Sequence, residues 1–291
     1  MSDFSGKTED IKDWIESYLT GLFPEIDERA APLSEAMLYS LNASGKRIRP
    51  VILVLVCKAV RGNEKDAIPY ACAIEYIHNY SLIHDDLPAM DDDDFRRGKP
   101  TNHMVYGEAM AILSGDGLLS AAFELMHNDY LQHMDDVGAL KRRIMAGAAI
   151  TYGCGCIGMV AGQAADIENE GKAVSSETLD FIHENKTAAL IRAAAEAGAL
   201  IGGAKPETVR AMREYGEYLG LAFQIADDIL DYDTEEGKAA YPAVHGLEAS
   251  KNKLDELSAM AADAVLNAQD TDEAYTKVLA KFAMKLAKRT K

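Results

Sequence analysis

Long stretches with the residue pattern of an α-helix, uninterrupted by proline, are the feature that most limits the possible folds of this chain. Residues 209–232, "VRAMREYGEYLGLAFQIADDILDY", run for about six helical turns without a proline. Residues 190–202, "LIRAAAEAGALIG", are rich in alanine and show no strand alternation. Since the sequence contains neither a strong hairpin signal nor a βαβ alternation, we predict an all-α fold.

Several predicted helices are apolar on more than one side, in particular residues 145–165 and 188–203. Such helices belong in the middle of large bundles. The 291 residues are enough for one large domain or two small ones, and no linker rich in serine and proline divides them. We therefore predict a single domain over residues 1–291, a large helical bundle.

Composition argues against several classes of function. The formal net charge of −17 at pH 7 disfavours nonspecific nucleic-acid binding but permits a local basic pocket. The longest apolar run, residues 51–56, is too short to span a bilayer, and the polar N-terminal residues do not form a signal peptide. The four cysteines are too few for a disulfide framework, and Cys154-Gly-Cys156 lacks redox or zinc spacing. We expect no membrane span, and the thiols fit a reducing cytoplasm.

Two acidic motifs end apolar helices. "LIHDDLPAMD" and "AFQIADDILD" each contain Asp-Asp followed by a further aspartate. In the second motif Asp227 and Asp231 share one helix face, where like charges are destabilising unless a cation offsets them. In the first motif Pro88 is predicted to end or bend the helix and to bring the last aspartate back within reach. The candidate metal ligands are Asp85, Asp86, Asp91, Asp227, Asp228 and Asp231.

The ligand chemistry of these aspartates favours magnesium or manganese. Carboxylates without interleaved cysteine or histidine suit Mg²⁺ or Mn²⁺ rather than zinc. The motifs are not EF-hands, because the loop glycine and the terminal glutamate are missing. Mg²⁺ usually takes one or two protein carboxylates and fills its remaining positions with water and phosphate oxygens. Two facing acidic motifs could therefore bind a polyphosphate through bridging metals.

Two basic clusters accompany the acidic motifs. "GKRIRP" contains Lys46, Arg47 and Arg49, and the first acidic motif is followed by Arg96 and Arg97. Guanidinium groups bind phosphate oxygens in a bidentate manner. An aspartate-rich helix end alone is commonly a solvated cap, and a basic run alone is commonly a surface cluster. The conjunction of both in an all-α chain favours a phosphorylated substrate with a divalent metal.

Five motifs together carry a family resemblance. They are "GKRIRP", "SLIHDDLPAMDDDDFRRGKPTNH", "GQAADI", "NKTAALI" and "FQIADDILD", in that order over residues 45–231. The sequence resembles the trans-polyprenyl diphosphate synthases, specifically those of the bacterial farnesyl diphosphate synthase (geranyltranstransferase) type. The resemblance implies the isoprenoid synthase fold, an antiparallel helical bundle around a central cavity, with the acidic motifs on opposite walls near its mouth.

The resemblance also implies an activity, head-to-tail prenyl transfer. Dimethylallyl or geranyl diphosphate would ionise, and isopentenyl diphosphate would attack the cation, giving farnesyl diphosphate while water is excluded. The implied cofactor is Mg²⁺, three ions per active site, with Mn²⁺ possible. Asp85, Asp86 and Asp91 would hold two ions, and Asp227, Asp228 and Asp231 the third. A homodimer in the cytoplasm, without nucleic-acid partners, is expected.

The family motifs assign the substrate contacts. The allylic diphosphate would be bound by Arg96, Lys186 and Lys238, and the isopentenyl diphosphate by Lys46, Arg49, His78 and Arg97. The allylic cation would be steadied by the dipoles of Lys186, Thr187 and Gln224. The assignment of Lys238 depends on a segment, "DYDTEEGKAAYP", that is shorter than the family's loop and lacks an earlier Gly-Lys. Either the loop is trimmed in this protein or a segment is missing from the sequence.

Tyr80 and Ser81 are the candidate chain-length residues. Position 80 lies five residues before Asp85, one to two turns deeper in the apolar helix. A tyrosine there could close the cavity behind a C15 chain, although it could also simply pack in the core. By resemblance, an aromatic residue here is typical of farnesyl-length enzymes, so we predict farnesyl diphosphate as the main product.

Other functions fit parts of the pattern. A geranylgeranyl or geranyl diphosphate synthase would differ only in product length. Terpene cyclases share the metal chemistry but usually lack "GKRIRP". A non-catalytic regulatory subunit of a prenyl synthase would be favoured by degenerate acidic motifs, and both motifs are intact here. An acidic Ca²⁺-binding scaffold would not need the basic clusters.

Overall fold

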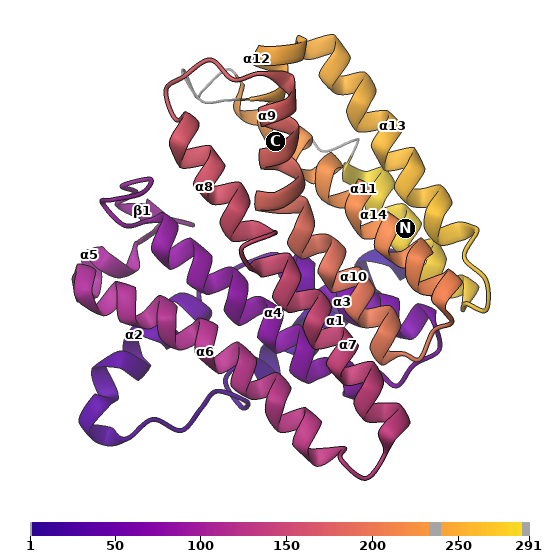
Figure 1. Ribbon diagram of the computed structural model, residues 1–291, viewed down its shortest axis with the longest axis horizontal. Coiled ribbons are helices and arrows are strands. Elements are labelled where there is room, and N and C mark those ends of the chain that lie inside the picture. Colours follow the sequence, from indigo (N-terminus) through magenta and orange to yellow (C-terminus); the bar gives the residue numbers. More distant parts are fainter. Residues whose placement is uncertain (1, 233–239, 287–291) are drawn as a thin grey trace. The chain divides into compact units, whose positions relative to one another are not determined.

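The structure is a computed structural model that describes residues 2–232 and 240–286. In this part of the chain it is almost entirely helical (Figure 1). The predicted all-α class is therefore confirmed.

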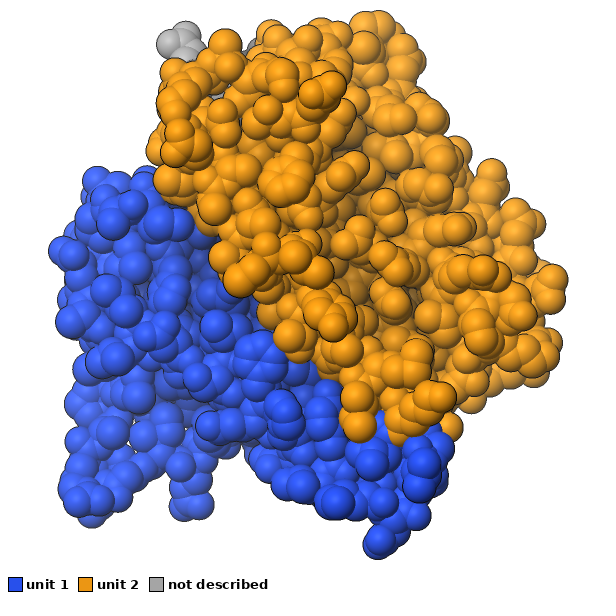
Figure 2. Space-filling view, in the orientation of Figure 1, with its two compact units in different colours: residues 1–51, 68–140 blue, residues 52–67, 141–291 orange. Residues whose placement is uncertain are grey.

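The chain forms two compact units, shown in different colours in Figure 2. The first unit comprises residues 1–51 and 68–140, and the second comprises residues 52–67 and 141–291. Three helices contribute residues to both units, namely α3 (Ile48–Ala59), α4 (Glu64–Asp85) and α7 (Val137–Cys154). The single domain stays a prediction, and each unit is described by itself.

The first unit has the buried part of α4 as its core. The side chains from Tyr70 to Ile77 are almost all inaccessible to solvent. The two tyrosines in this stretch satisfy their hydroxyl groups, since Tyr70 donates to Asp129 (2.8 Å) and Tyr76 donates to the Leu19 carbonyl (2.6 Å). The other elements of this unit are α1 (Ser2–Leu19), a 3₁₀ turn (Glu28–Ala30), α2 (Ala31–Leu41), β1 (Phe95–Arg96), β2 (Lys99–Pro100), α5 (Asn102–Tyr106) and α6 (Glu108–Gln132).

A short hairpin, which the sequence did not signal, follows the first acidic motif. Strands β1 and β2 are antiparallel, with Arg96 opposite Lys99. The two turn residues both have positive φ, 53° at Arg97 and 77° at Gly98, as in a type I′ turn. Arginine is uncommon in this conformation, which is why the sequence signal is weak. The hairpin places Arg96 on a strand and Arg97 at the tip.

The second unit packs the alanine-rich helix α10 (Ala189–Ile201) against α11 (Pro206–Asp231). Eleven of the 13 residues of α10 are buried, which confirms the expectation for residues 188–203. A glycine of α11 permits the close approach, because a Cβ on Gly216 would lie 2.7 Å from the Arg192 Cα. The other elements are α8 (Met159–Asn169), α9 (Ser176–Ile182), the π-helical turn η2 (His183–Ala188), α12 (Tyr241–His245), α13 (Leu247–Leu266) and α14 (Glu273–Leu286).

Residues 145–165 differ from the prediction. The helix breaks after Cys154, and α8 begins at Met159. Helix α7 buries Ala146 and Ile150 but exposes other large apolar side chains, so the expected place in the middle of a bundle is wrong for this segment. The exposed apolar residues of α7 are Val137, Ile144, Met145 and Tyr152.

Two stretches, residues 108–132 and 137–169, are long and apolar enough to cross a membrane by length and composition. This is weak evidence, because core helices of soluble proteins pass the same test. The second stretch is moreover interrupted between α7 and α8.

The close approach of α3 and α10 yields a stability prediction. A Cβ on Gly198 would lie 2.3 Å from the Leu53 carbonyl oxygen, so Gly198→Ala must push the two backbones apart. We expect the free energy of unfolding to fall by about 1–3 kcal/mol in urea titrations. The control is Gly6→Ala in α1, where no heavy atom lies within 4 Å of the new Cβ. Alanine should there be neutral or stabilise by up to ~1 kcal/mol, and equal losses in both variants would contradict the packing argument.

Candidate functional site

The first acidic motif forms a compact turn at the end of α4. The helix ends at Asp85, and the Met90 N–H donates to the Leu87 carbonyl (2.8 Å). The Asp91 N–H then donates to the Asp85 carbonyl (2.8 Å). The prediction that the helix ends before Pro88 and that Asp91 returns toward Asp85 is confirmed.

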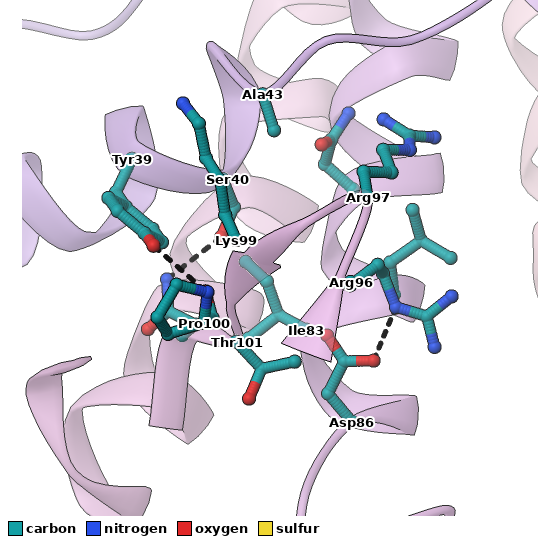
Figure 3. A pocket seen from close by; sticks show the side chains of 13 residues that line it. Tyr39, Ser40, Ala43, Ile83, Asp86, Arg96, Arg97, Lys99, Pro100 and Thr101 are labelled. Carbon is teal, nitrogen blue, oxygen red and sulfur yellow. Dashed lines mark hydrogen bonds and ion pairs between the residues drawn. The ribbon is translucent and has the colours of Figure 1, made fainter. Parts of the chain in front are cut away.

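Arg96 lies against this motif. Its guanidinium bonds to the carboxylate of Asp86, whose residue is only 4% exposed, and to that of Asp93 (3.1 Å). Burial raises the pKa of Asp86 above its ordinary value, and the ion pair with Arg96 opposes that shift. Figure 3 shows Asp86 and Arg96 facing each other. The two residues are therefore held as a pair.

Arg49, His78 and Arg97 form the centre of a basic cluster. Arg49 Nη1 lies 3.4 Å from His78 Nε2. Burial, followed by the charges of Arg49 and three further arginines, lowers the pKa of His78 well below its ordinary value. The imidazole is thus neutral and accepts the hydrogen bond from Arg49. Arg97 reaches the cluster across Gly45, where a Cβ would lie 2.8 Å from the Arg97 Nη1.

Arg47, the middle basic residue of "GKRIRP", has a structural role. It is 5% exposed, has φ 47°, and donates to Glu75 Oε1 (2.6 Å) and Glu16 Oε1 (3.1 Å). Its second terminal nitrogen donates to the carbonyls of Leu41 and Ala43, both at 2.8 Å. With four acceptors inside the protein, this guanidinium fixes the turn between Lys46 and Arg49 and is not available to an anion.

A pocket that is partly open to solvent lies beside the hairpin (Figure 3). Its walls come from α2, α4 and the hairpin segment. Three of its lining residues are cations, Arg96, Arg97 and Lys99, against one carboxylate, Asp86. The charge of this pocket suits an anionic ligand. The lining residues are Tyr39, Ser40, Ala43, Asn79, Leu82, Ile83, Asp86, Arg96, Arg97, Lys99, Pro100, Thr101 and Asn102.

The candidate chain-length residues lie in the buried part of α4. Tyr80 is 8% exposed, and its ring meets the His84 ring edge-on at 5.7 Å between centroids. The Ser81 hydroxyl donates to the His78 carbonyl (3.0 Å) and is thus bonded to its own helix. The role of these two residues in product length stays a prediction.

In the second unit, α11 carries the second acidic motif near its C-terminal end. Asp227, Asp228 and Asp231 are all partly buried. The Asp228 carboxylate accepts from Gln224 Nε2 (2.8 Å) on one oxygen, and from the Tyr241 N–H (2.7 Å) on the other. The ring of His183 places its Nε2 3.2 Å from this second oxygen.

The π-helical turn η2 supplies the next residues of the site. A π turn widens the helix and is frequent at functional sites. Lys186 bonds to Asp166 Oδ2 (2.5 Å), and the Thr187 hydroxyl donates to Gln224 Oε1 (2.7 Å). Helix α8 lies directly against the turn, since a Cβ on Gly162 would lie 2.1 Å from the backbone nitrogen of Lys186. The structure thus brings Lys186 next to α8 and Thr187 next to α11.

Two residues with evident contacts at this site had no predicted role. Asp166 belongs to "GQAADI", and His183 precedes Lys186 by three residues, one helical turn away. The motif and the spacing were available in the sequence, but neither names a bonding partner. The predicted substrate contact Lys238 lies outside the described residues.

No group of three or more histidine, cysteine, aspartate or glutamate side chains within residues 2–232 and 240–286 is close enough to hold a metal ion by itself. Mg²⁺ takes few protein carboxylates and completes its shell with water and substrate oxygens. Two features fit such an ion: hard oxygen ligands only, and the i, i+4 spacing of Asp227 and Asp231 on one helix face.

Comparison with known families defines the class to which this helical chain with two aspartate motifs and two basic clusters belongs. The model of the polyprenyl synthetase family matches residues 30–278. The chain therefore belongs to the polyprenyl synthetase family.

Several characterised relatives are similar over most of their length. The farnesyl diphosphate synthase of Geobacillus stearothermophilus is 48% identical over 243 residues, covering 78% of this chain and 80% of the relative. The farnesyl diphosphate synthase of Bacillus subtilis (strain 168) is 44% identical over 259 residues, covering 84% of this chain and 86% of the relative. The crystal structure of an FPP/GFPP synthase from Zymomonas mobilis, 33% identical, has a TM-score of 0.88 and covers 99% of this chain and 100% of that one.

Proposed function

We propose that this protein is a prenyltransferase that joins isopentenyl diphosphate head to tail with dimethylallyl and then geranyl diphosphate, giving farnesyl diphosphate. The observation that carries the proposal concerns the two basic side chains, Arg96 and Lys186, that are assigned to the allylic diphosphate and lie within the described residues. Each of them lies beside an aspartate. Arg96 bonds to Asp86 in the first unit, and Lys186 bonds to Asp166 in the second. The farnesyl diphosphate synthases among the relatives support the same activity.

Diphosphate binding is assigned to the basic residues. Lys46, Arg49, His78 and Arg97 would bind isopentenyl diphosphate, with the neutral His78 as a hydrogen-bonding group. Arg96 and Lys186 would bind the allylic diphosphate, and Lys238 is proposed with them from the sequence alone. Cations in these positions stabilise the negative charge that grows on the leaving diphosphate.

Divalent metal is assigned to the aspartates of the two motifs, as Mg²⁺ with three ions per site. The ions would supply electrostatic stabilisation of the leaving group. Because Mg²⁺ takes only one or two protein carboxylates, six aspartates need not all bind metal directly. Asp85, Asp91, Asp227 and Asp231 are proposed as direct ligands, while Asp86 already pairs with Arg96.

The cation formed by ionisation needs dipoles rather than a base. Thr187 and Gln224 lie 2.7 Å apart in one hydrogen bond and would present their oxygens to it. The released diphosphate can accept the proton lost after coupling, so no protein base is assigned. The apolar helices keep water away from the cation.

The experiment that tests the activity is a product assay. Purified protein with isopentenyl and dimethylallyl diphosphates and Mg²⁺ should form a C15 diphosphate, and excess EDTA should abolish the reaction because the leaving group loses its stabilisation. Asp227→Ala should lower kcat about 10²-fold or more. The control Asp255→Ala, an exposed aspartate of α13, should keep full activity. Full turnover in excess EDTA would contradict the metal assignment.

Product length is the one alternative favoured by a specific observation. Relatives named geranylgeranyl pyrophosphate synthases, among them the large subunit 1 of the heterodimeric enzyme of Arabidopsis thaliana, are up to 46% identical. Their similarity is close to that of the farnesyl diphosphate synthases, so overall identity does not decide the length. The residue at position 80 is the proposed determinant.

Tyr80→Ala is expected to lengthen the product. Removing a buried ring opens space along α4, so the chain should grow to C20 or beyond while the first condensation still proceeds. Product sizes are measured by chromatography after dephosphorylation. Tyr80→Phe, which keeps the ring, is the matched control and should still stop at C15. If Tyr80→Ala also stops at C15, another residue limits the chain.

A homodimer is proposed from the surface of α7. Ile144, Met145 and Tyr152 are exposed on this helix, and clustered exposed apolar side chains are typical of interfaces. Sedimentation equilibrium should give twice the mass of one chain, and a monomer at micromolar concentration would contradict the proposal.

A cytoplasmic location is proposed because all four cysteines carry free thiols.

A further inference from the structure

The carboxylate of Asp228, in the second acidic motif, is held by contacts on both of its oxygens. Its side chain is 9% exposed, and both oxygens accept hydrogen bonds from the protein. Oδ1 accepts from Gln224 Nε2 (2.8 Å), and Oδ2 accepts from the Tyr241 N–H (2.7 Å) and lies 3.2 Å from His183 Nε2. Gln224 lies on α11, Tyr241 on α12 and His183 on η2, so groups of three elements surround one carboxylate.

The bonds to Asp228 determine which way the Gln224 amide points. A backbone N–H can only donate, so Oδ2 must accept, and an ionised carboxylate is an acceptor on both oxygens. The group of Gln224 that faces Asp228 must therefore be the NH₂. The amide oxygen is then directed to Thr187, whose hydroxyl lies 2.7 Å away.

The orientation of Gln224 in turn determines the role of the Thr187 hydroxyl. Because Gln224 presents an acceptor, Thr187 must use its only hydrogen to donate. The lone pairs of the Thr187 oxygen then remain directed away from that bond. The Asp228 carboxylate at the end of this hydrogen-bond chain polarises it, which increases the electron density on the oxygens of Gln224 and Thr187. Such oxygens stabilise a neighbouring cation.

We propose that Asp228 is a positioning residue that orients Gln224 and Thr187, with their oxygens available to the allylic cation, rather than a metal ligand. The inference rests on the proposed prenyl transfer. Gln224, the Tyr241 N–H and His183 together occupy three of the about four acceptor positions of the Asp228 carboxylate, which leaves one position, on Oδ1, for any other ligand. Asp227, the preceding residue on the same helix, is the natural comparison because it points about 100° around the helix from Asp228.

His183 supports this arrangement. Its side chain is 4% exposed and stacks on the Tyr241 ring, with 5.9 Å between the ring centroids and 25° between the planes. The other neighbour of the Tyr241 ring is the His245 ring, tilted by 31° with 4.3 Å between the centroids. The ring and the backbone N–H of Tyr241 thus hold the same two residues, His183 and Asp228, in place.

The test compares Asp228→Asn with Asp227→Asn. Asparagine keeps the shape of aspartate but presents both a donor and an acceptor, so the Gln224 amide is no longer forced into one orientation. For Asp228→Asn we expect kcat to fall about 10- to 100-fold, the usual effect of losing a supporting residue. The KM values for both diphosphates and the Mg²⁺ concentration for half-maximal rate should be unchanged. For Asp227→Asn the required Mg²⁺ concentration should rise.

A second measurement does not depend on turnover. Mg²⁺ with inorganic pyrophosphate should raise the melting temperature of the wild type through binding to the folded state. Asp228→Asn should keep the full shift, and Asp227→Asn should lose much of it. His183→Phe, which keeps the ring but removes the donor, should lower kcat in the same direction as Asp228→Asn, and His183→Gln, which restores a donor, should recover it.

Three results would overturn the inference. The first is that Asp228→Asn changes the Mg²⁺ requirement or the melting shift in the same way as Asp227→Asn. The second is that the kcat of Asp228→Asn equals that of the wild type. The third is that the two His183 variants are equally active. A wild-type protein that shows the melting shift but forms no prenyl product would instead overturn the proposed function, and with it the cation that the oriented oxygens are meant to stabilise.

Discussion

The structure depends on how negative charge is held at the ends of two apolar helices. Clustered carboxylates repel one another, and a partly buried carboxylate without donors is costly. In the first unit the guanidinium of Arg96 bonds to Asp86. In the second unit Asp228 is satisfied by Gln224 and the Tyr241 N–H, with His183 beside it. Each acidic motif is thus stabilised by groups that also lie at the proposed site.

Close packing of small residues places these donors. Helix α11 approaches α10 through Gly216 and the π turn through Gly220, and α8 approaches the π turn through Gly162. These contacts bring Thr187 within 2.7 Å of Gln224, and Lys186 within 2.5 Å of Asp166. A side chain at any of these glycines would separate the backbones, so the geometry of the site and the packing of the second unit have the same origin.

Features that depend on residues close together in the sequence were predicted correctly, whereas features that depend on the folded surroundings were missed. The helical class, the buried α10 and the turn at Pro88 follow from local patterns and were predicted correctly. The hairpin was missed, because Arg97 adopts a positive φ that arginine rarely takes by itself. Residues 145–165 were misjudged, because an apolar composition does not distinguish a buried face from an exposed one.

The sequence by itself determined the class of fold, the two acidic motifs, the basic clusters and their chemistry, since these depend on residue type and on spacing within a few turns. Only the tertiary structure decided which partners these residues have. It paired Arg47 with Glu75, and it brought Thr187 to Gln224 and the Tyr241 N–H to Asp228. The physical reason is that a hydrogen bond has a direction and a partner, and both are set by elements far apart in the chain that pack together only in the folded protein.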